Sequence, residues 1–363
     1  TKDYYKKILV EALPLESFMY FHLPDLLVTE ISTSVIESKQ DCVDWLAYTY
    51  FYRRLHANPS FYGVKDITPY GISAYLTELV ESTLTDLQNS SMIEIESQKS
   101  ADEGVVSETI SPLTGCMVSS HYNTSFLTMT MLLSSLSGSA TLQDILHILS
   151  QASEFDSIPL REDELSMLRK LNERVPLRVT DLAGSNLFAN KIFLLLQAHF
   201  SRLSLAVDFR SDLKIILEKA VPLVNTVIDV LSGDGKLNAM TAMDISQMII
   251  QGLWDVDSPL KQIPYFDDDV LTKCSERTIE TVYDIMALED AEREEIMPSE
   301  DSKLLKIANF VNNYPNVELE YSIDQGREIK ANEATTINLT LTRDELPETL
   351  EVFSEKYPLE KLE

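Results

Sequence analysis

The hydrophobic pattern is most regular between residues 211 and 254, where it predicts a long helical hairpin. Apolar side chains of the first arm, residues 212–231, recur at spacings of three and four, which is typical of one buried helical stripe. The Ser-Gly-Asp-Gly run at 232–235 predicts the end of this arm, because glycine adopts a left-handed conformation without steric cost. Asn238 is a candidate N-cap of the second arm. Two such helices need further helices around them, so the pattern predicts a bundle.

Two features qualify this hairpin. Pro222 lies inside the first arm, and it predicts a kink or a break, since proline lacks the donor that a helix interior requires. Met240, Met243 and Met248 follow helical spacing in the second arm and predict core packing. An adaptable groove for a partner is the alternative interpretation of these methionines.

Upstream, the pattern predicts a winged-helix-like domain at residues 25–97. A helical pattern spans residues 26–57, an amphipathic helix spans 70–90, and the alternation at 92–96 predicts a short strand. Residues 1–24 contain Pro14 and predict an extended connector from an upstream domain. Residues 98–115 are polar and acidic and predict a flexible segment, whose deletion we expect to leave thermal stability almost unchanged.

The helix at 70–90 has the wrong charge for reading a nucleic-acid duplex. It contains Glu78, Glu81 and Asp86 but no lysine or arginine, whereas base edges are read mainly by Arg, Lys, Asn and Gln. The sequence therefore favours a structural or docking role for this domain.

The remaining chain predicts a mainly α fold that ends in strands. A helical bundle is expected at 116–258 and a helix-loop-helix at 259–315; between Asp267 and Asp301 there are thirteen Asp or Glu against three Lys or Arg. From residue 316 to 363, runs at 317–323 and 335–342 alternate as strands do. We interpret them as the first strands of an immunoglobulin-like sandwich, which needs about seven strands and is expected to be partial here.

The composition narrows the function. The 363 residues carry a formal net charge of −28, which opposes non-specific attraction to phosphates or anionic membranes. The three cysteines are scattered, which suits a reducing compartment, and no apolar run is long enough to span a bilayer. Because residue 1 is Thr rather than Met, we expect an internal fragment of a longer chain.

No catalytic, cofactor-binding or metal-binding motif stands out. The phosphate-binding pattern G-x-x-x-x-G-K-[ST] does not occur, and the glycine turn at 233–235 fails the ligand spacing of a calcium loop. The five histidines are isolated from one another, and His199 lies in an apolar run where a core position is expected. The sequence therefore predicts no enzyme activity and no cofactor for this part of the chain.

Several blocks of the sequence resemble the winged helix and the Sec-type homology unit that follow the motor domains of large spliceosomal DExH-box RNA helicases. The blocks lie in one order along essentially the whole chain: 13–17, Tyr52-Arg53-Arg54 with Asn58-Pro59 and Tyr62, 194–198 with Ser201-Arg202, Trp254 with 258–262, and 311–319. The family arranges winged helix, helical bundle, helix-loop-helix and immunoglobulin-like domain in this order, which fits the boundaries drawn above.

The resemblance implies a nuclear protein of the spliceosome whose parent helicase uses ATP and magnesium in its motor domains to separate paired small nuclear RNAs. Such helicases carry two cassettes, and this chain is more similar to the second, inactive one. The implied partners are spliceosomal proteins and the N-terminal cassette of the same parent chain. Homology with a membrane-translocon component gives a weaker interpretation, because this chain has neither a membrane span nor a co-chaperone domain.

Two functional hypotheses follow. The first is a non-catalytic protein-interaction and regulatory module with weak or no direct RNA binding and no membrane contact. The alternative is a nucleic-acid-handling module in which a bundle helix lines an RNA channel. Residues 211–255 hold six acidic residues and three lysines, which disfavours the alternative; Lys214 and Lys219 are its candidate RNA contacts.

Overall fold

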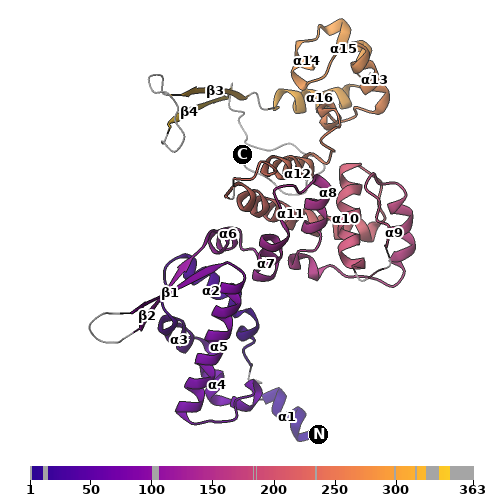
Figure 1. Cartoon of the computed structure of the whole chain (residues 1–363). Coiled ribbons are helices and arrows are strands. Elements are labelled where there is room, and N and C mark those ends of the chain that lie inside the picture. The colour runs from indigo at the N-terminus through magenta and orange to yellow at the C-terminus, as the bar shows by residue number, and fades with distance from the viewer. Residues whose placement is uncertain are drawn as a thin grey trace. The chain divides into compact units, whose positions relative to one another are not determined.

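A computed structural model describes residues 2–10, 15–99, 106–182, 184, 186–233, 235–297, 300–314, 317–323 and 335–343 (Figure 1). The chain forms two compact units. The first comprises residues 1–195 and 219–246, and the second comprises residues 196–218 and 247–363. Within the described ranges, no helix is both long and apolar enough to cross a membrane.

The winged-helix region lies in the first unit. Its elements are, in chain order, η1 (Met19–His22), α2 (Leu23–Ser32), α3 (Lys39–Ala47), α4 (Tyr50–Ala57), η2 (Pro59–Tyr62), α5 (Pro69–Asn89), β1 (Ile93–Lys99) and β2 (Val106–Pro112). Helix α5 packs against both α2 and α3. The apolar stripe of α5 is buried at Ile72, Leu76, Val80, Leu84 and Leu87, as its 3.6-residue period predicts.

Residues 26–57 form parts of three helices instead of one continuous helical pattern. The breaks occur where a hydroxyl side chain starts a new helix: Ser38 accepts a hydrogen bond from the amide of Asp41, and Thr49 accepts one from the amide of Tyr52. Such N-caps satisfy amides that have no partner inside the helix. Apolar spacing alone does not reveal them, because it continues across the break.

The prediction of an extended connector at residues 1–24 is wrong for residues 2–10 and 19–24, whereas residues 15–18 lie in no helix. Helix α1 spans Lys2–Val10, a stretch without proline or glycine, and η1 and the start of α2 follow before residue 25. Pro24 lies in the first turn of α2, where its missing donor does no harm. Residues 11–14, including Pro14, lie outside the described residues.

The prediction of a flexible segment at 98–115 is wrong for residues 106–115. Strand β2 pairs antiparallel with β1 and places Ile110 opposite Ile95. Ile110 is 3% exposed, and its amide donates to the carbonyl of Glu37 at 2.8 Å. Helix α6 (Thr114–Tyr122) begins directly afterwards. Deleting 98–115 removes half of this wing, so we expect a large loss of thermal stability, the reverse of the sequence-based expectation.

The bundle continues the first unit and contributes helices to the second. Its elements are α6, α7 (Phe126–Ser135), α8 (Leu142–Leu149), η3 (Ser153–Ser157), α9 (Glu164–Asn172), α10 (Leu187–Phe200), α11 (Val207–Gly233) and α12 (Ala239–Gln251). Residues 191–200 of α10 are all buried. Helix α11 runs without interruption through Pro222, so the predicted break does not occur.

The turn between α11 and α12 confirms one prediction and corrects two. Helix α11 ends at Gly233, and Gly235 has φ +67°, which is the left-handed conformation expected of this glycine run. The side-chain amide of Asn238 donates to the carbonyl of Ser137 at 2.8 Å instead of capping α12. Met248 is buried as predicted, but Met240 is 67% exposed and Met243 is 45% exposed, so neither belongs to the core.

Residues 259–314 form a subdomain of more helices than the predicted helix-loop-helix. It contains η4 (Pro259–Gln262), α13 (Asp268–Glu276), α14 (Val282–Ala287), α15 (Asp290–Ile296) and α16 (Asp301–Asn312). Reciprocal capping boxes at Thr281 with Asp284, and at Glu289 with Glu292, start α14 and α15. Its core is made by Leu260, Ile263, Phe266, Cys274, Ile279, Val282, Ile285, Ile296, Ile307, Phe310 and Val311.

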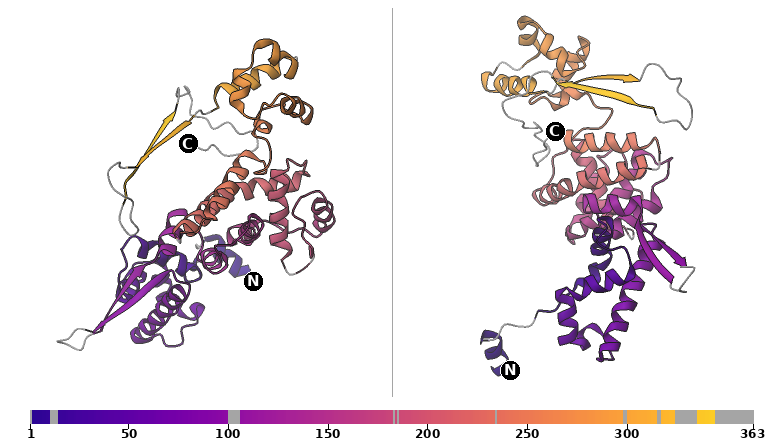
Figure 2. Two further views of the ribbon diagram at one scale, coloured as in Figure 1. Left: turned by 45° about the horizontal axis from the view of Figure 1, so that its top comes forward. Right: turned by 90° about the vertical axis from the view of Figure 1, so that its left-hand side faces the viewer.

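The two strands predicted after residue 316 are confirmed. Strand β3 (Val317–Ile323) pairs antiparallel with β4 (Ile337–Arg343), a pair separate from β1–β2 (Figure 2). Every residue of β3 is exposed. The immunoglobulin-like sandwich stays a prediction, because residues 324–334 and 344–363 lie outside the described residues. The mainly α fold class is confirmed.

Candidate functional site: two polar networks and a basic hollow

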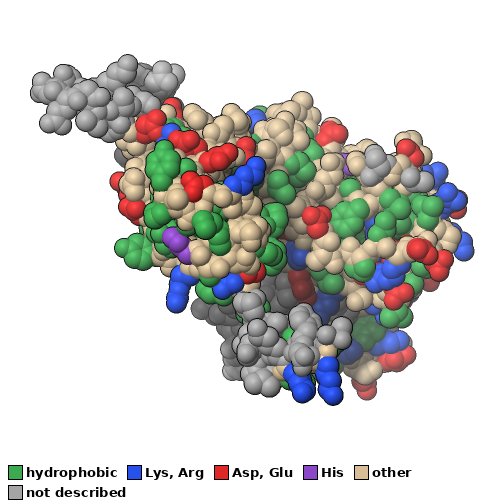
Figure 3. Space-filling model, turned by 90° about the horizontal axis from the view of Figure 1, so that it is seen from below, with side chains coloured by type: hydrophobic (Ala, Val, Ile, Leu, Met, Phe, Trp, Pro, Cys, Tyr) green, Lys and Arg blue, Asp and Glu red, His purple; other side chains and the backbone are tan. Residues whose placement is uncertain are grey.

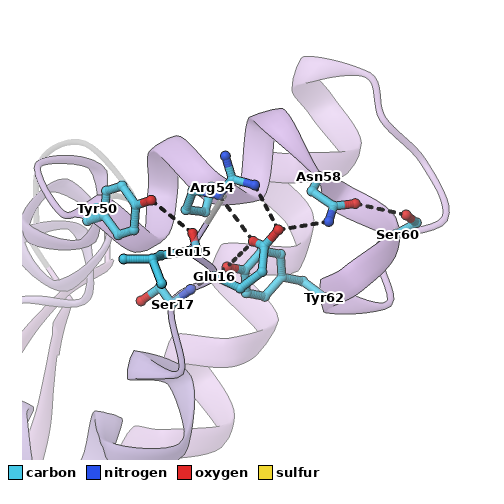
Figure 4. A network of polar contacts seen from close by, with 8 residues as sticks. All are labelled: Leu15, Glu16, Ser17, Tyr50, Arg54, Asn58, Ser60 and Tyr62. Atoms are coloured by element: carbon cyan, nitrogen blue, oxygen red, sulfur yellow. Dashed lines mark hydrogen bonds and ion pairs between the residues drawn. The ribbon is translucent and has the colours of Figure 1, made fainter. Parts of the chain in front are cut away.

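A glutamate at the entrance to the winged-helix region holds three side chains of that region (Figure 4). The carboxylate of Glu16 accepts two hydrogen bonds from Arg54, at 2.7 Å from Nη2 and 3.1 Å from Nε. The side-chain amide of Asn58 donates to it at 2.9 Å, and the hydroxyl of Tyr62 donates at 3.1 Å. The guanidinium fork matches both carboxylate oxygens, so this pair fixes orientation as well as distance. We call this cluster the Glu16 network.

Backbone contacts on either side of Glu16 complete the attachment. The amide of Ser17 donates to the hydroxyl oxygen of Tyr62 at 2.9 Å, and the hydroxyl of Tyr50 donates to the carbonyl of Leu15 at 2.9 Å (Figure 4). Hydrogen bonds from Arg54, followed by those from Asn58 and Tyr62, lower the pKa of Glu16 from 4.5 to about 2. A carboxylate that is ionised and surrounded by donors holds a segment in place; it is poorly suited to transfer protons near neutral pH.

In the second unit, Arg202 connects the end of α10, where it lies, to the end of α12 and to η4. The guanidinium of Arg202 donates to the carbonyl of Gly252 at 2.9 Å, to that of Gln251 at 3.1 Å, and to that of Lys261 in η4. The carbonyls of Gln251 and Gly252 end helix α12, where the helix dipole is negative, so a cation is favourable there. We call this cluster the Arg202 network.

The backbone of Arg202 is held in an unusual conformation at the end of α10. Its φ is +50°, and the amides of Arg202 and Leu203 donate to the carbonyls of His199 and Ala198 in the pattern of a Schellman motif. Glycine usually occupies this position, since other residues are strained there. Beside it, the indole of Trp254 donates to the hydroxyl of Ser201 at 2.8 Å. The side-chain bonds of Arg202 therefore stabilise a turn that its backbone alone disfavours.

A hollow of about 550 Å³ opens beside the Arg202 network, entirely within the second unit. Its lining is formed by Ala198, His199, Arg202, Leu203, Ser204, Leu205, Arg210, Leu213, Lys214 and Leu217. Two arginines and a lysine line it, and no carboxylate does. The predicted core histidine, His199, is buried and bonds the carbonyl of Ile249 at 2.7 Å, which confirms that prediction. We call this space the basic hollow.

The two lysines proposed as RNA contacts have different surroundings. Lys214 is exposed at the basic hollow. Lys219 donates to the carbonyl of Glu154 at 2.5 Å and to the hydroxyl of Ser157 at 3.0 Å, both in η3 of the first unit. Five residues along a helix correspond to a rotation of about 140°, so the two side chains leave α11 in different directions. The structure does not bring them to one site, and RNA contact by either stays a prediction.

Comparison with known proteins adds the family. The model of the Sec63 Brl domain matches residues 112–361, and a model of a winged helix-turn-helix domain matches residues 16–97. The chain belongs to the Sec63 Brl domain family. The winged-helix match begins at Glu16, so the Glu16 network lies within it. The family resemblance and the winged-helix prediction are thereby confirmed.

Relatives of this Sec63 Brl chain are much longer proteins. It is 40% identical over 97% of its length to the pre-mRNA-splicing factor brr2 of Schizosaccharomyces pombe, and 36% identical over 95% to the human U5 small nuclear ribonucleoprotein 200 kDa helicase. It is 39% identical over 94% to the ATP-dependent RNA helicase DExH12 of Arabidopsis thaliana. The chain spans 16% of the length of each of these relatives.

The blocks that carry the family resemblance form much of the two networks. Glu16, Arg54, Asn58 and Tyr62 meet in the first, and Arg202 and Lys261 meet in the second. These residues are far apart in the sequence and join separate segments of the Sec63 Brl chain.

A buried ion pair in the first unit has almost no signal in the sequence. The ammonium of Lys191 lies 2.8 and 3.0 Å from the two carboxylate oxygens of Glu164 and 2.7 Å from the carbonyl of Pro159. Their side chains are 0% and 2% exposed. The only signal was a lysine inside the apolar run of α10, and its partner could not be named without the fold.

Neither a metal-binding cluster nor an activated cysteine thiol occurs among the described residues. Within the described ranges, no group of three or more His, Cys, Asp or Glu could hold a metal ion. Burial raises the pKa of the Cys42 thiol to about 12 and that of Cys116 to about 11. Thiols of such high pKa are poor nucleophiles at neutral pH.

Charge is mixed on one face of the molecule. On the face seen in Figure 3, Lys and Arg side chains are interspersed with Asp and Glu, and apolar side chains lie among them. Large exposed apolar residues on the winged-helix region include Phe18 at 56%, Phe21 at 65% and Phe61 at 43%. A mixed surface with exposed aromatic side chains is more typical of protein contacts than of a phosphate-binding track.

Proposed function

We propose that this Sec63 Brl chain is a non-catalytic protein-docking and regulatory module of a nuclear, ATP-dependent RNA helicase that unwinds paired small nuclear RNAs in the spliceosome. This assignment of the parent protein is supported by relatives named as a splicing factor and as a U5 small nuclear ribonucleoprotein helicase. The observation that carries the docking role is the group of exposed aromatic side chains of the winged-helix region, Phe18, Phe21 and Phe61, whose rings lie together. Its partners are spliceosomal proteins and the N-terminal cassette of the same parent, and ATP and magnesium act in the motor domains.

Capture from nuclear extract tests this proposal. The tagged chain is incubated with extract that has or has not been treated with ribonuclease, and retained proteins are identified by mass spectrometry. We expect spliceosomal proteins to be retained equally in both samples. A matched tag-only sample controls for the matrix. Loss of all spliceosomal proteins after ribonuclease treatment would contradict a docking module and favour RNA-mediated association.

The basic hollow supports a second candidate function, an RNA contact in a helicase channel. Arg202, Arg210 and Lys214 line the hollow without a carboxylate among the lining residues, although the chain is acidic overall. Single-stranded RNA should then bind with an affinity that falls steeply between about 50 and 200 mM salt.

The variant Lys214→Ala tests this second candidate. If Lys214 contacts a phosphate, the slope of log K against log salt should fall by about 0.7. Lys65→Ala is the matched control, since Lys65 is an exposed lysine of the winged-helix region. An unchanged slope for Lys214→Ala, or equal changes in both variants, would remove Lys214 from any RNA path.

A further inference from the structure

The subdomain of helices α13–α16 has an apolar groove that neither network uses. The groove has a volume of about 280 Å³ and lies within the second unit. It is lined by Ile285, Met286, Arg293, Met297, Leu304, Ile307, Ala308, Val311 and Asn312. These residues belong to α14, to α16 and to the end of α15 with Met297 just after it. We call it the α16 groove.

One side of the groove is a regular helical stripe. Leu304, Ile307, Ala308 and Val311 are spaced by three and four residues, so they share one face of α16. Ile307 and Val311 form a buried floor, whereas Ala308 is exposed. A floor of buried apolar atoms beside a small exposed residue leaves room for an inserted side chain.

The other side of the groove is adaptable. Met286 is 45% exposed and Met297 is partly buried. Methionine is unbranched and flexible, so it adjusts to side chains of different shape and is common at surfaces that bind several partners. A volume near the lower end of small-molecule pockets, about 300 Å³, suits a few apolar side chains better than a large cofactor.

Three cations of this subdomain already interact with neighbouring groups. Lys303 and Lys306 of α16 lie 5.7 and 5.6 Å from the ring centroid of Tyr265, and Lys306 also donates to its hydroxyl at 3.0 Å. Arg293, which lines the groove, donates to the carbonyl of Met286 at 2.7 Å. The positive charges near the groove are therefore already engaged.

Carboxylates dominate the surroundings. The sequence from Asp267 to Asp301 contains thirteen Asp or Glu and three Lys or Arg, a net charge of −10. Glu289, the N-cap of α15, and Glu292 and Glu294 within α15 are exposed. An apolar groove in a negative field excludes nucleic acid and attracts a cationic partner.

We propose that the α16 groove binds an amphipathic helix of a partner protein. Apolar side chains at positions i, i+3 or i+4, and i+7 of that helix enter the groove, and lysines or arginines beside them face the carboxylates of α15 and its neighbours. The inference rests on the docking function proposed above and adds the chemistry of one partner.

A synthetic peptide provides the test. The probe has about 14 residues, four helical turns, with leucine at positions i, i+3, i+7 and i+10, lysine elsewhere and a fluorophore at one end. Fluorescence anisotropy with the whole chain measures its affinity. We expect saturable binding, weakened by salt, and at least about tenfold weaker binding to Ala308→Arg, since the new side chain fills the groove and repels lysine.

Asn309→Arg is the matched control. Asn309 is the exposed neighbour of Ala308 on α16 and does not line the groove, so the added charge is the same but the groove stays open. We expect its affinity to change by less than about twofold. Equal weakening by both variants would reduce the interaction to general charge attraction and overturn the proposal. So would equal binding of a peptide in which glutamate replaces every lysine.

The same variant separates this proposal from the function on which it rests. Suppose that the peptide fails to bind the unmodified chain, and that Ala308→Arg captures the same ribonuclease-resistant proteins as the unmodified chain. The groove proposal is then overturned while the docking function stands. If Ala308→Arg loses a subset of proteins that Asn309→Arg retains, the groove is assigned as their docking site. Circular dichroism of both variants checks that the helices are intact.

Discussion

The Glu16 and Arg202 networks both join separate segments of the chain, the first through a carboxylate and the second through a guanidinium. In the first, one carboxylate accepts from Arg54, Asn58 and Tyr62 and so fixes the segment before α2. In the second, one guanidinium donates to carbonyls of two segments that follow α10 by about fifty residues or more. Each network joins pieces that local helix propensity cannot join.

The difference between them lies in their response to the solvent. Glu16 titrates, because a carboxylate can be protonated in acid, whereas the guanidinium of Arg202 stays charged at any ordinary pH. The Glu16 network binds side chains, which mutation can remove, and the Arg202 network binds backbone carbonyls, which mutation cannot. We therefore expect acid to weaken the attachment at the winged-helix region and to spare the attachment in the second unit.

The largest effect is expected from Arg202→Ala. It removes three charged hydrogen bonds and leaves alanine in a left-handed conformation, and we expect the second unit to lose about 3 kcal/mol of its free energy of unfolding. The chain has two tryptophans, Trp45 in the winged-helix region and Trp254 in the Arg202 network. Urea denaturation followed by Trp254 fluorescence, in a Trp45→Phe background, measures the loss.

Arg202→Gly separates the two causes. Glycine also lacks the guanidinium but adopts φ +50° without strain, so it should be more stable than Arg202→Ala by about 1 kcal/mol. Equal stability of the two variants would show that the backbone of Arg202 is not strained. Stability equal to that of the unmodified chain in both would show that the carbonyl bonds contribute nothing.

Glu16→Gln should have the next largest effect, and it should depend on pH. The folded pKa of about 2 lies below the usual 4.5, so ionised Glu16 stabilises the fold fully above pH 4.5, and this contribution is lost as pH falls towards 2. We expect a clear fall in the thermal midpoint at neutral pH. The difference between the variant and the unmodified chain should shrink progressively between pH 4.5 and 2.

The control is Glu94→Gln, at an exposed position of β1. It removes the same charge without touching the Glu16 network, so its effect on the midpoint should be small. A difference between Glu16→Gln and the unmodified chain that stays constant down to pH 2 would show that the hydrogen-bond geometry of the carboxylate, and not its charge, provides the stabilisation.

Much of the fold is predictable from patterns that repeat along the chain. The stripes of α5 and α11, the glycine turn after Gly233 and the strand β3 were expected from spacing alone, and the structure confirms them. The wing strand β2 was missed because its alternation is short and lies in an acidic stretch. It becomes a strand through pairing with β1 and through Ile110 contacting the backbone of Glu37, which are tertiary contacts.

The candidate site was predictable only in part, for a related reason. Lys214 and Lys219 were candidate RNA contacts of the alternative hypothesis, but the sequence could not orient them. In the structure Lys214 lines the basic hollow, whereas Lys219 donates to η3. The roles of Glu16 and Arg202 depend on partners 38 to 59 residues away. A sequence pattern shows the periodicity within one element, whereas these bonds depend on how separate elements pack together. The bonds could therefore not be predicted from the pattern.

The smallest effect is expected from Arg277→Ala, which tests whether enclosure gives the Glu16 network its strength. Arg277 and Glu295 also form an ion pair, and Arg277 lowers the pKa of Glu295, as Arg54 lowers that of Glu16. However, their side chains are 41% and 65% exposed, against 17% and 14% for Arg54 and Glu16. Water and salt screen an exposed pair, so we expect no measurable change in the thermal midpoint at physiological salt. A fall as large as that of Glu16→Gln would mean that the charge pair itself, without the surrounding donors, determines the stability of both regions.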